Sequence, residues 1–476
     1  MNTIMNTMTT PTTPVLVDAT MLLRWKHLAP VGIVRLERLI AGHLRRSGAF
    51  DDVRFVVWDH GYRYSDEQET DDLDELLNGN LRAQGDHGTL TTAVATPASA
   101  PAGRRGFVTR VRRTGLRTLG RVPDHLRPFA EQAMWSVATL GVESVRHVKR
   151  RRAEHRSTAT PVSSGSIRHR IDLDDTVDLV ALGLGWEYLD HEAMYRLKVE
   201  HGVRIHMPAF DLIPVLMPQM NAGQSHLVHR FYAEMAHYAD TITSISFATR
   251  DALADFYRDE SLPTPHLAVN QLPGLDPATT DAPTTGGHRF AGERFVLSVS
   301  TIEIRKNHLL LAKLWAECIR EGRDMPKLVI VGRYGWDIGE LQRWAANAPE
   351  LEDRFVMCPD VDDDELMALY RDAEFTVFPS RVEGWGLPIT ESLAYGKACI
   401  HSDDPAQFEA SQNLMPALHP DDFLGWKREI LRLLDHPDDR IELEQRIATE
   451  YVAKSAGEYC AEFEAIVRGR REETPA

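Results

Sequence analysis

Two glutamates, eight positions apart, flank a glycine turn late in the chain. In the stretch SRVEGWGLPITESLAYG, Glu383 and Glu391 stand on either side of Gly384 and Gly386. Glycine lets a ligand approach the backbone amides closely, and Pro388 suits the first position of a helix whose first turn would hold Glu391. The amino end of a helix attracts a diphosphate. Because carboxylates repel phosphate, we expect the glutamates to bind hydroxyls on each side of it, which fits a sugar nucleotide.

The same residues also allow a purely structural interpretation. Glu391 would then only complement the dipole of its helix, and Glu383 would be a surface acid in a glycine turn. The setting favours a binding site, because the strand pattern FTVFPS leads into the turn and AYGKACI leads from the helix into a further strand.

Strand and helix patterns alternate along most of the chain. In the first half, VLVDAT, DLVALGLG and GVRIHMPAFD are short apolar runs, and TITSISFATRDALADFYR joins a strand to a helix capped by Ser246 or Thr249. In the second half, the successive strands are RFVLSVST, KLVIVG, RFVMCPDV, AEFTVFPS and KACIHSDD. These patterns predict an α/β protein with two doubly wound halves, and a ligand site at the carboxyl ends of the strands.

The chain of 476 residues is too long for one hydrophobic core. Composition predicts the following order: a disordered tail over 1–13, a first domain over 14–274 with a basic insertion at about 61–166, a linker rich in Pro, Thr and Gly over 275–290, a second domain over 291–450, and a helical segment over 451–476.

The net charge of −16 argues against binding of nucleic acid by the bulk of the chain, but the charge is unevenly distributed. Between Arg104 and Arg156, 14 Lys and Arg residues face only four acids. One interpretation is a solvated, partly disordered insertion. Another is a surface that docks on anionic lipid, where each charge contributes ~1 kcal/mol. RNA binding is a third.

Other global features point to the cytoplasm. No apolar run approaches the ~20 residues that span a bilayer, and the start of the chain lacks the charge and apolar core of a secretory signal. The four cysteines show neither a disulfide pattern nor a zinc pattern, so we interpret them as reduced thiols that mostly pack.

Several motifs together resemble a known family. PSRVEGWGLPITESLAYGKACI resembles the E-x7-E signature of the retaining glycosyltransferases of family 4, which have the GT-B fold of two Rossmann-like domains facing a cleft. FVLSVSTIEIRKNHLLLAKLW, KLVIVGRYGW and PDVDDDELMALYRDAEFTVFPS are similar to segments of that family in order and spacing. GWEYLD, FDLIPVLMP and ADTITSISFAT resemble its polysaccharide-assembly branch. The tail KSAGEYCAEFEAIVRG would be a helix that crosses back onto the first domain.

The resemblance implies roles for individual residues. Glu391 would hold the ribose diol of the donor, Glu383 the hydroxyls of the donor sugar, and Val361 the base through its backbone. Arg305 and Lys306 match the basic pair that neutralises the leaving diphosphate. They could also be a charged helix start, although cations there oppose the helix dipole. The backbone amides expected to contact the sugar and diphosphate are those of Gly384, Trp385, Gly386 and Leu387.

The sequence departs from the family pattern at two places. Ser300 stands where many members carry an arginine, so either Arg305 and Arg333, next to Gly332, take over that role or it stays unfilled. Phe210 stands where many members carry a histidine, so Asp211 becomes the candidate that orients the acceptor hydroxyl or the donor. A strand-end cap is the alternative for Asp211.

The first loop offers two further candidates. Gly32 would let the backbone approach the phosphate, and Arg35 would reach into the cleft; packing at a helix start is the alternative for both. The acids Asp362–Asp364 are expected to cap a helix beginning near Glu365 rather than to bind a metal, and no cofactor or metal is expected.

Together these features predict a cytoplasmic enzyme, with a peripheral position on the inner face of the membrane as a further hypothesis. It would transfer a hexose, first of all mannose from GDP-mannose, with retention to a glycan or lipid-linked glycan in cell-surface polysaccharide or lipopolysaccharide synthesis. Two alternatives stay open: a sugar-nucleotide epimerase of the same fold, and a catalytically silent subunit of a polysaccharide assembly complex.

Overall fold

A computed structural model describes residues 14–78, 177–274 and 287–469, apart from gaps at 25, 27–31, 51, 60, 184, 222 and 224. The predicted tail over 1–13, the basic segment between Arg104 and Arg156, and most of the predicted linker lie outside the described residues. Residues 62–78, at the start of the predicted insertion, form a strand and a helix.

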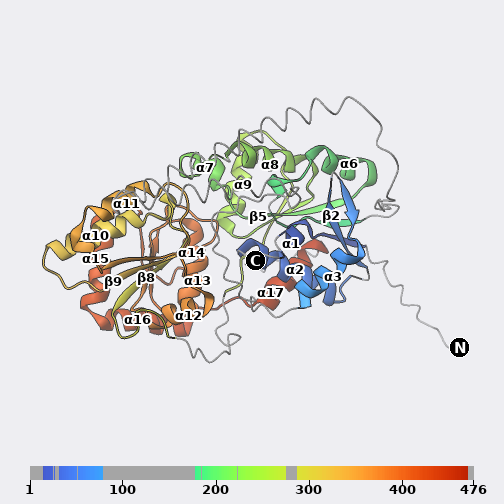
Figure 1. The fold of residues 1–476 in the computed structure, drawn as a ribbon. Helices are drawn as coiled ribbons and strands as arrows, with labels where there is room; N and C mark the ends of the chain where they lie inside the picture. The colour runs from blue at the N-terminus through green and yellow to red at the C-terminus, as the bar shows by residue number, and fades with distance from the viewer. Residues whose placement is uncertain are drawn as a thin grey trace, which may run out of the picture. The chain divides into compact units, whose positions relative to one another are not determined.

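The first half of the chain forms a seven-stranded sheet in the order β3-β2-β1-β4-β5-β6-β7 (Figure 1). All neighbouring strands are parallel except β2 and β3, which pair antiparallel. Its strands are β1 (Val15–Asp18), β2 (Val53–Trp58), β3 (Tyr62–Tyr64), β4 (Asp178–Val180), β5 (Arg204–Ala209), β6 (Thr241–Ser244) and β7 (His266–Val269).

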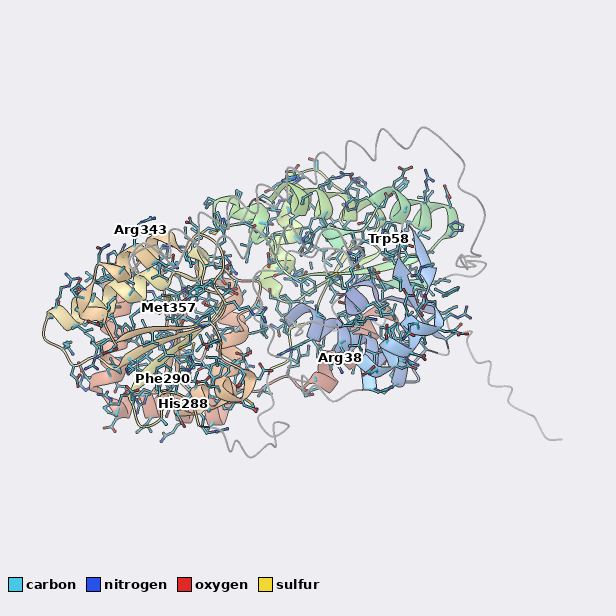
Figure 2. The ribbon with its side chains drawn as sticks, in the orientation of Figure 1. Arg38, Trp58, His288, Phe290, Arg343 and Met357 are labelled. Carbon is cyan, nitrogen blue, oxygen red and sulfur yellow. The ribbon has the colours of Figure 1, made fainter. Side chains whose placement is uncertain are left out.

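Helices connect these strands. They are α1 (Thr20–Arg24), α2 (Gly32–Arg46), α3 (Glu67–Asn78), α6 (His191–His201), α7 (Ile213–Leu216), α8 (Ser225–Tyr238) and α9 (Phe247–Asp259), with short 3-10 turns η2 (Gly185–Glu187) and η3 (Pro218–Met220). The predicted cap of α9 is confirmed, since the Ser246 side chain accepts a hydrogen bond from the Thr249 amide. Trp58, labelled in Figure 2, meets Tyr62 edge-on in the core.

The second half forms a six-stranded, fully parallel sheet in the order β10-β9-β8-β11-β12-β13. Its strands are β8 (Phe295–Val299), β9 (Lys327–Val331), β10 (Phe355–Cys358), β11 (Thr376–Phe378), β12 (Cys399–Ser402) and β13 (Ala417–Leu418). Its helices are α10 (His308–Arg320), α11 (Gly339–Ala346), α12 (Asp363–Asp372), α13 (Leu387–Ala394), α14 (Pro405–Ser411), α15 (Phe423–Asp435) and α16 (Pro437–Glu450), with 3-10 turns η5 (Ile304–Lys306) and η6 (Pro349–Leu351).

The last helix, α17 (Ala456–Val467), packs away from the sheet that precedes it in the sequence. Tyr459, Cys460 and Phe463 are buried in the same core as β1 and α2 of the first sheet, and Figure 1 draws α17 in red beside the blue α2. A Ser455–Glu458 capping box begins this helix. The predicted fold class, two doubly wound α/β halves, is confirmed.

Candidate active site

The second sheet reverses its strand order between β8 and β11. From β8 the chain adds β9 and β10 on one side, and β11, β12 and β13 lie on the other. In doubly wound sheets the connections diverge at such a point and leave space for a ligand beyond the carboxyl ends of the strands. Here β8 runs into the segment that carries Arg305 and Lys306, and β11 runs into the segment that carries Glu383.

Arg305, Lys306 and Glu383 form one buried ionic cluster. Arg305 Nη1 lies 2.9 Å from Glu383 Oε2, and Lys306 Nζ lies 2.5 Å from Glu383 Oε1. The side chains of Lys306 and Glu383 are only 10% and 9% exposed. Arg305 also donates to the Val382 carbonyl at 2.7 Å and to Glu303 at 2.9 Å. The distance between Arg305 and Glu383 in the sequence did not predict this contact. The two residues meet because they follow the carboxyl ends of β8 and β11, which are neighbours in the sheet.

The cluster fixes the charge of its members. Burial alone would raise the pKa of Glu383, but Lys306 and Arg305 outweigh burial and hold that pKa at about 2. Burial lowers the pKa of Lys306, which Glu383 partly offsets and Arg305 reinforces. Burial also acts to lower the pKa of Arg305, yet Glu383 and Glu303 raise it above its usual value. Two cations therefore stand beside two carboxylates, and a diphosphate would share these cations with Glu383.

The position of the missing arginine is filled by a neutral pair. Ser300 Oγ lies 3.1 Å from His308 Nε2, and both side chains are buried. Burial, reinforced by Lys306, lowers the pKa of His308 to about 3, so the imidazole is neutral at physiological pH. Ser300 therefore brings no positive charge to the site.

Only a glycine fits at position 332, because the backbone of Ser300 lies against it. A Cβ built on Gly332 would lie 2.0 Å from the Ser300 carbonyl oxygen, and its φ of 148° lies in the region that favours glycine. The close approach holds the end of β9 against the end of β8. The next residue, Arg333, is exposed, and its carbonyl accepts a hydrogen bond from the Ile302 amide at 2.8 Å.

The two glycines of the turn, Gly384 and Gly386, are required for different reasons. A Cβ on Gly384 would lie 2.2 Å from the Phe210 carbonyl oxygen and 3.0 Å from Asp211 Cβ, so this glycine admits another part of the chain. Gly386 has a φ of 120° and is the residue before helix α13. The buried Trp385 indole N–H has no hydrogen-bond partner among the described residues.

The predicted start of the helix after this turn is wrong by one position. Helix α13 begins at Leu387, which is 36% exposed, so Pro388 is its second residue and Glu391 its fifth. Glu391 thus lies beyond the first turn, where the helix dipole is strongest. Proline tolerates either position, because the second amide of a helix also lacks an intrahelical acceptor.

Glu391 is partly buried and is hydrogen-bonded to a buried tyrosine. Its Oε2 accepts a hydrogen bond from the Tyr370 hydroxyl at 2.7 Å, and the Tyr370 ring is stacked on Tyr395 with centroids 5.6 Å apart. Burial raises the pKa of Glu391 to about 7, against the opposing effects of Tyr370 and Arg35. Arg35 pairs with Asp363 at 3.1 Å.

Asp211 lies close to the cluster without joining it. Its Oδ1 accepts a hydrogen bond from the Ile213 amide at 3.0 Å, as the cap interpretation expects. Burial raises its pKa, and Arg305 is the strongest of the opposing charges. Asp211 can therefore serve as a cap and still face the basic pair electrostatically.

The remaining candidates are placed as follows. Val361 is partly buried against the core beside β10. Gly32 is the first residue of α2, and most of the loop before it lies outside the described residues. The predicted cap by Asp362 is confirmed, since it accepts from the Glu365 amide at 2.8 Å and α12 begins one residue later.

Sequence reasoning missed the residues that support the turn. Gln407 is fully buried and connects the ends of β11 and β12. Its side-chain Nε2 donates to the Ser380 carbonyl at 2.8 Å, and its side-chain Oε1 accepts from the Ser402 backbone amide at 3.0 Å. Ser380 donates to Glu383, and Asp404 caps helix α14. An uncharged glutamine 27 positions after the serine it holds gives no periodic signal in one sequence.

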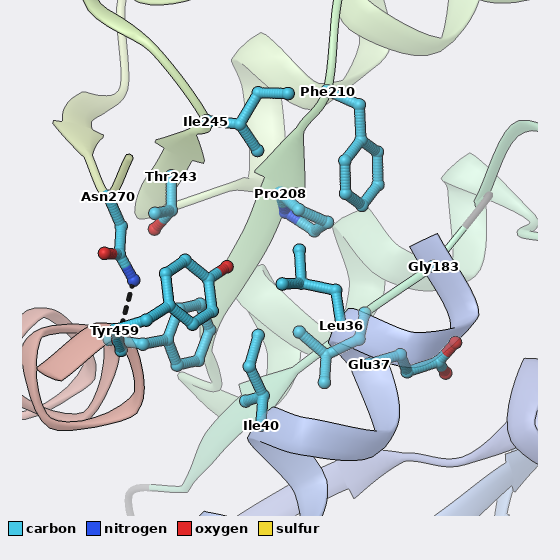
Figure 3. Close-up of a pocket in the computed structure, with 12 residues that line it drawn as sticks. Leu36, Glu37, Ile40, Gly183, Pro208, Phe210, Thr243, Ile245, Asn270 and Tyr459 are labelled. Atoms are coloured by element: carbon cyan, nitrogen blue, oxygen red, sulfur yellow. Dashed lines mark hydrogen bonds between the residues drawn. The ribbon is translucent and has the colours of Figure 1, made fainter. Parts of the chain in front are cut away.

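A separate small hollow lies in the first half of the chain, between the sheet and helices α2 and α17 (Figure 3). Phe210, Pro208 and Leu36 line it, and Tyr459 accepts a hydrogen bond from Asn270 at its edge. Its lining is mostly apolar but includes Glu37, whose two carboxylate oxygens are buried without a hydrogen-bond partner among the described residues. Within the described residues, no group of three or more His, Cys, Asp or Glu side chains is arranged to hold a metal ion. The described helices include none that is long and apolar enough for a membrane span.

Comparison with known proteins gives a match for the second half of the chain. Residues 287–446 match the family model described as "Glycosyl transferases group 1". The chain is similar to the serotype-specific mannosyltransferase WbdA of Escherichia coli, with 25% identity over 215 residues that cover 42% of this chain and 26% of WbdA. It is also similar to the O-antigen chain mannosyltransferase RfbU of Salmonella typhimurium, with 27% identity over 203 residues that cover 41% of this chain and 52% of RfbU.

The chain therefore spans about a quarter to a half of the length of these relatives. Among solved structures, it is similar to an α,α-trehalose 6-phosphate synthase from Burkholderia multivorans, with a TM-score of 0.47 and 13% identity over 64% of this chain and 74% of that one. The family match and the mannosyltransferase relatives support a glycosyltransferase, and two α/β sheets, one parallel and one parallel except for β3, are consistent with the GT-B fold.

Proposed function

We propose that this protein is a retaining glycosyltransferase that moves a hexose from a nucleoside-diphosphate sugar to a hydroxyl of a glycan acceptor in polysaccharide synthesis. The observation that carries the proposal is the buried contact of Arg305 and Lys306 with Glu383 at the switch point of the second sheet. Buried charges with strongly shifted pKa values cluster at functional sites, and the family match covers the same residues.

The basic pair would act on the leaving group. Negative charge grows on the nucleoside diphosphate as the glycosidic bond breaks, and two fixed cations in a buried site stabilise that charge more than they stabilise the intact donor. Glu383 would then turn from its cations to the hydroxyls of the donor sugar. The Gly384–Leu387 amides would approach the diphosphate, and Gly332 with Arg333 would line its other side.

Acceptor activation would need no side-chain nucleophile. In a front-face reaction the acceptor oxygen forms the new bond on the side from which the diphosphate leaves, and the departing phosphate oxygen takes the acceptor proton. Asp211, with the pKa of its carboxyl raised by burial, would orient the acceptor hydroxyl or the donor. No metal would be required, because Arg305 and Lys306 supply the positive charge.

Mannose from GDP-mannose is the proposed donor. This choice of donor is supported by the two relatives, both of which are described as mannosyltransferases. The proposed acceptor is a lipid-linked glycan at the inner face of the membrane, reached through the basic segment between Arg104 and Arg156. Deletion of that segment should abolish co-sedimentation with anionic liposomes; unchanged co-sedimentation would overturn this part.

The test is transfer of mannose from GDP-mannose by Lys306→Ala, with Lys313→Ala as the matched control. Lys313 lies on the neighbouring helix α10, is 42% exposed and pairs weakly with Glu340 at 3.9 Å. Loss of one buried cation should reduce the rate by about 10²–10³, whereas the control should keep full activity. Full activity of Lys306→Ala would refute the site, and release of an altered free sugar nucleotide without acceptor would indicate an epimerase instead.

A further inference from the structure

Tyr370 is a buried residue that contacts Glu391. It lies on helix α12, is 1% exposed, and its hydroxyl donates to Glu391 Oε2 at 2.7 Å. Its ring lies almost parallel to that of Tyr395, at an angle of 7°. The stack and the burial fix the ring, so the hydroxyl cannot leave Glu391 without a rearrangement of the core.

Few polar or charged groups act on Glu391. From α12 come Tyr370 and Asp363, and from α2 comes Arg35, which is paired with Asp363. Arg35 is 51% exposed and shared, so solvent and Asp363 weaken its effect. The Tyr370 hydroxyl is therefore the main group that favours the charged form of Glu391 against burial.

We propose that Tyr370 is a positioning residue that favours the ionised form of Glu391 and aims its carboxylate at the ribose of the nucleotide, so that donor affinity depends on pH. The inference rests on the proposed function, in which Glu391 holds the ribose diol. The hydroxyl takes up Oε2, and among the described residues it is the hydrogen-bond donor to that carboxylate. Oε1 would accept hydrogen bonds from the ribose hydroxyls.

The consequence follows from the ionisation of Glu391. A carboxylate accepts hydrogen bonds from two hydroxyls more strongly than a neutral carboxyl group does. Because burial raises the pKa of Glu391 to about 7, its charge changes near neutral pH. Removing the Tyr370 hydroxyl removes a hydrogen bond that favours the charged form of Glu391. The pKa of Glu391, and with it the pH at which donor affinity changes, should therefore rise by about one unit.

The experiment is calorimetric binding of GDP, UDP and ADP to the full chain between pH 5.5 and 9. The tightest of the three is then compared with its 2′,3′-dideoxy analogue. The ratio of the two dissociation constants cancels the ionisation of the phosphates, which both ligands share. In the wild-type protein, the dissociation constant of the dideoxy analogue divided by that of the ribonucleotide should fall as the pH falls through 7. Only the ribose hydroxyls contact Glu391, so only the ribonucleotide should lose affinity when Glu391 becomes neutral.

Tyr370→Phe is the main variant, and Tyr257→Phe is its matched control. Tyr257 is equally buried, but its hydroxyl has no partner among the described residues. In Tyr370→Phe the dissociation constant of the ribonucleotide should rise about 5-fold at pH 7 and recover by pH 9, following a one-unit shift. The dideoxy analogue should bind all three proteins alike.

Each outcome decides one point. If Glu391→Gln binds the ribonucleotide and its dideoxy analogue as the wild-type protein does, or no nucleotide binds at all, the proposed function fails. If Glu391→Gln loses the ribose preference but Tyr370→Phe keeps the wild-type pH profile, the inference about Tyr370 is overturned. An affinity loss in Tyr370→Phe that persists at pH 9 would also overturn it, because that loss would reflect packing.

Discussion

Replacing Glu383 by Gln should destabilise the second half of the chain strongly at neutral pH. The glutamine keeps the shape of the carboxyl group but leaves Lys306 and Arg305 without their counterion in a buried site. The pKa of Glu383 falls from an ordinary 4.5 to about 2. At 1.36 kcal/mol per unit, the ionised form contributes about 3 kcal/mol to the free energy of unfolding.

The sign of the pH dependence follows from the lowered pKa. Because the folded pKa lies below the unfolded one, the contribution is complete above pH 4.5 and is lost as the pH falls toward 2. The difference between wild type and Glu383→Gln should therefore be about 3 kcal/mol at pH 7 and less than half of that at pH 3.

Calorimetric melting and urea unfolding at several pH values measure this difference. For a domain of this size, about 3 kcal/mol corresponds to a decrease in Tm of about 6–12 °C. Glu340→Gln is the control, because its side chain is 67% exposed and its pair with Lys313 should contribute less than about 1 kcal/mol. A Glu383→Gln effect no larger than that of the control, or one that does not change with pH, would refute the buried cluster.

Three further predictions follow from single contacts. Gly332→Ala should cost more than about 3 kcal/mol in unfolding free energy, because its Cβ would overlap the Ser300 carbonyl, whereas Gly202→Ala, with φ of 68° and open space around it, should cost only about 1–2 kcal/mol; equal Tm changes would contradict this. Gly384→Ala should abolish transfer through its overlap with the Phe210 carbonyl, and an active variant would show that the two segments are not in contact. Since burial raises the folded pKa of Glu391 to about 7, wild-type stability should fall as the pH rises from 4.5 through 7, and Glu391→Gln should remove that part of the slope; an unchanged slope in urea titrations would contradict it.

The sequence predicts the elements of this fold well because their signals are local. Apolar runs identify β8, β9 and β11, and the side chains that cap α9 and α12 stand beside the helices they cap. The glycine turn and the basic pair are also visible as short motifs. The start of α13 was misplaced by one residue, since proline tolerates both of the first two helical positions.

The partners within the site are harder to predict because they are distant in sequence. Tyr370 precedes Glu391 by 21 positions, and its pattern in α12 is that of any buried helical residue. Gln407 acts through an amide that no charge pattern marks. Glu303 could have been noticed as an acid beside the basic pair, but its role depends on the turn that brings it to Arg305.

Arg305, Lys306 and the two glutamates are proposed to form the binding site of a nucleoside-diphosphate sugar. The most direct measurement is calorimetric binding of GDP-mannose and GDP to the wild-type protein, Lys306→Ala and Lys313→Ala. One nucleotide should bind per wild-type chain, with unchanged affinity in Lys313→Ala and at least about tenfold weaker affinity in Lys306→Ala. Equal affinity in Lys306→Ala and Lys313→Ala would contradict it.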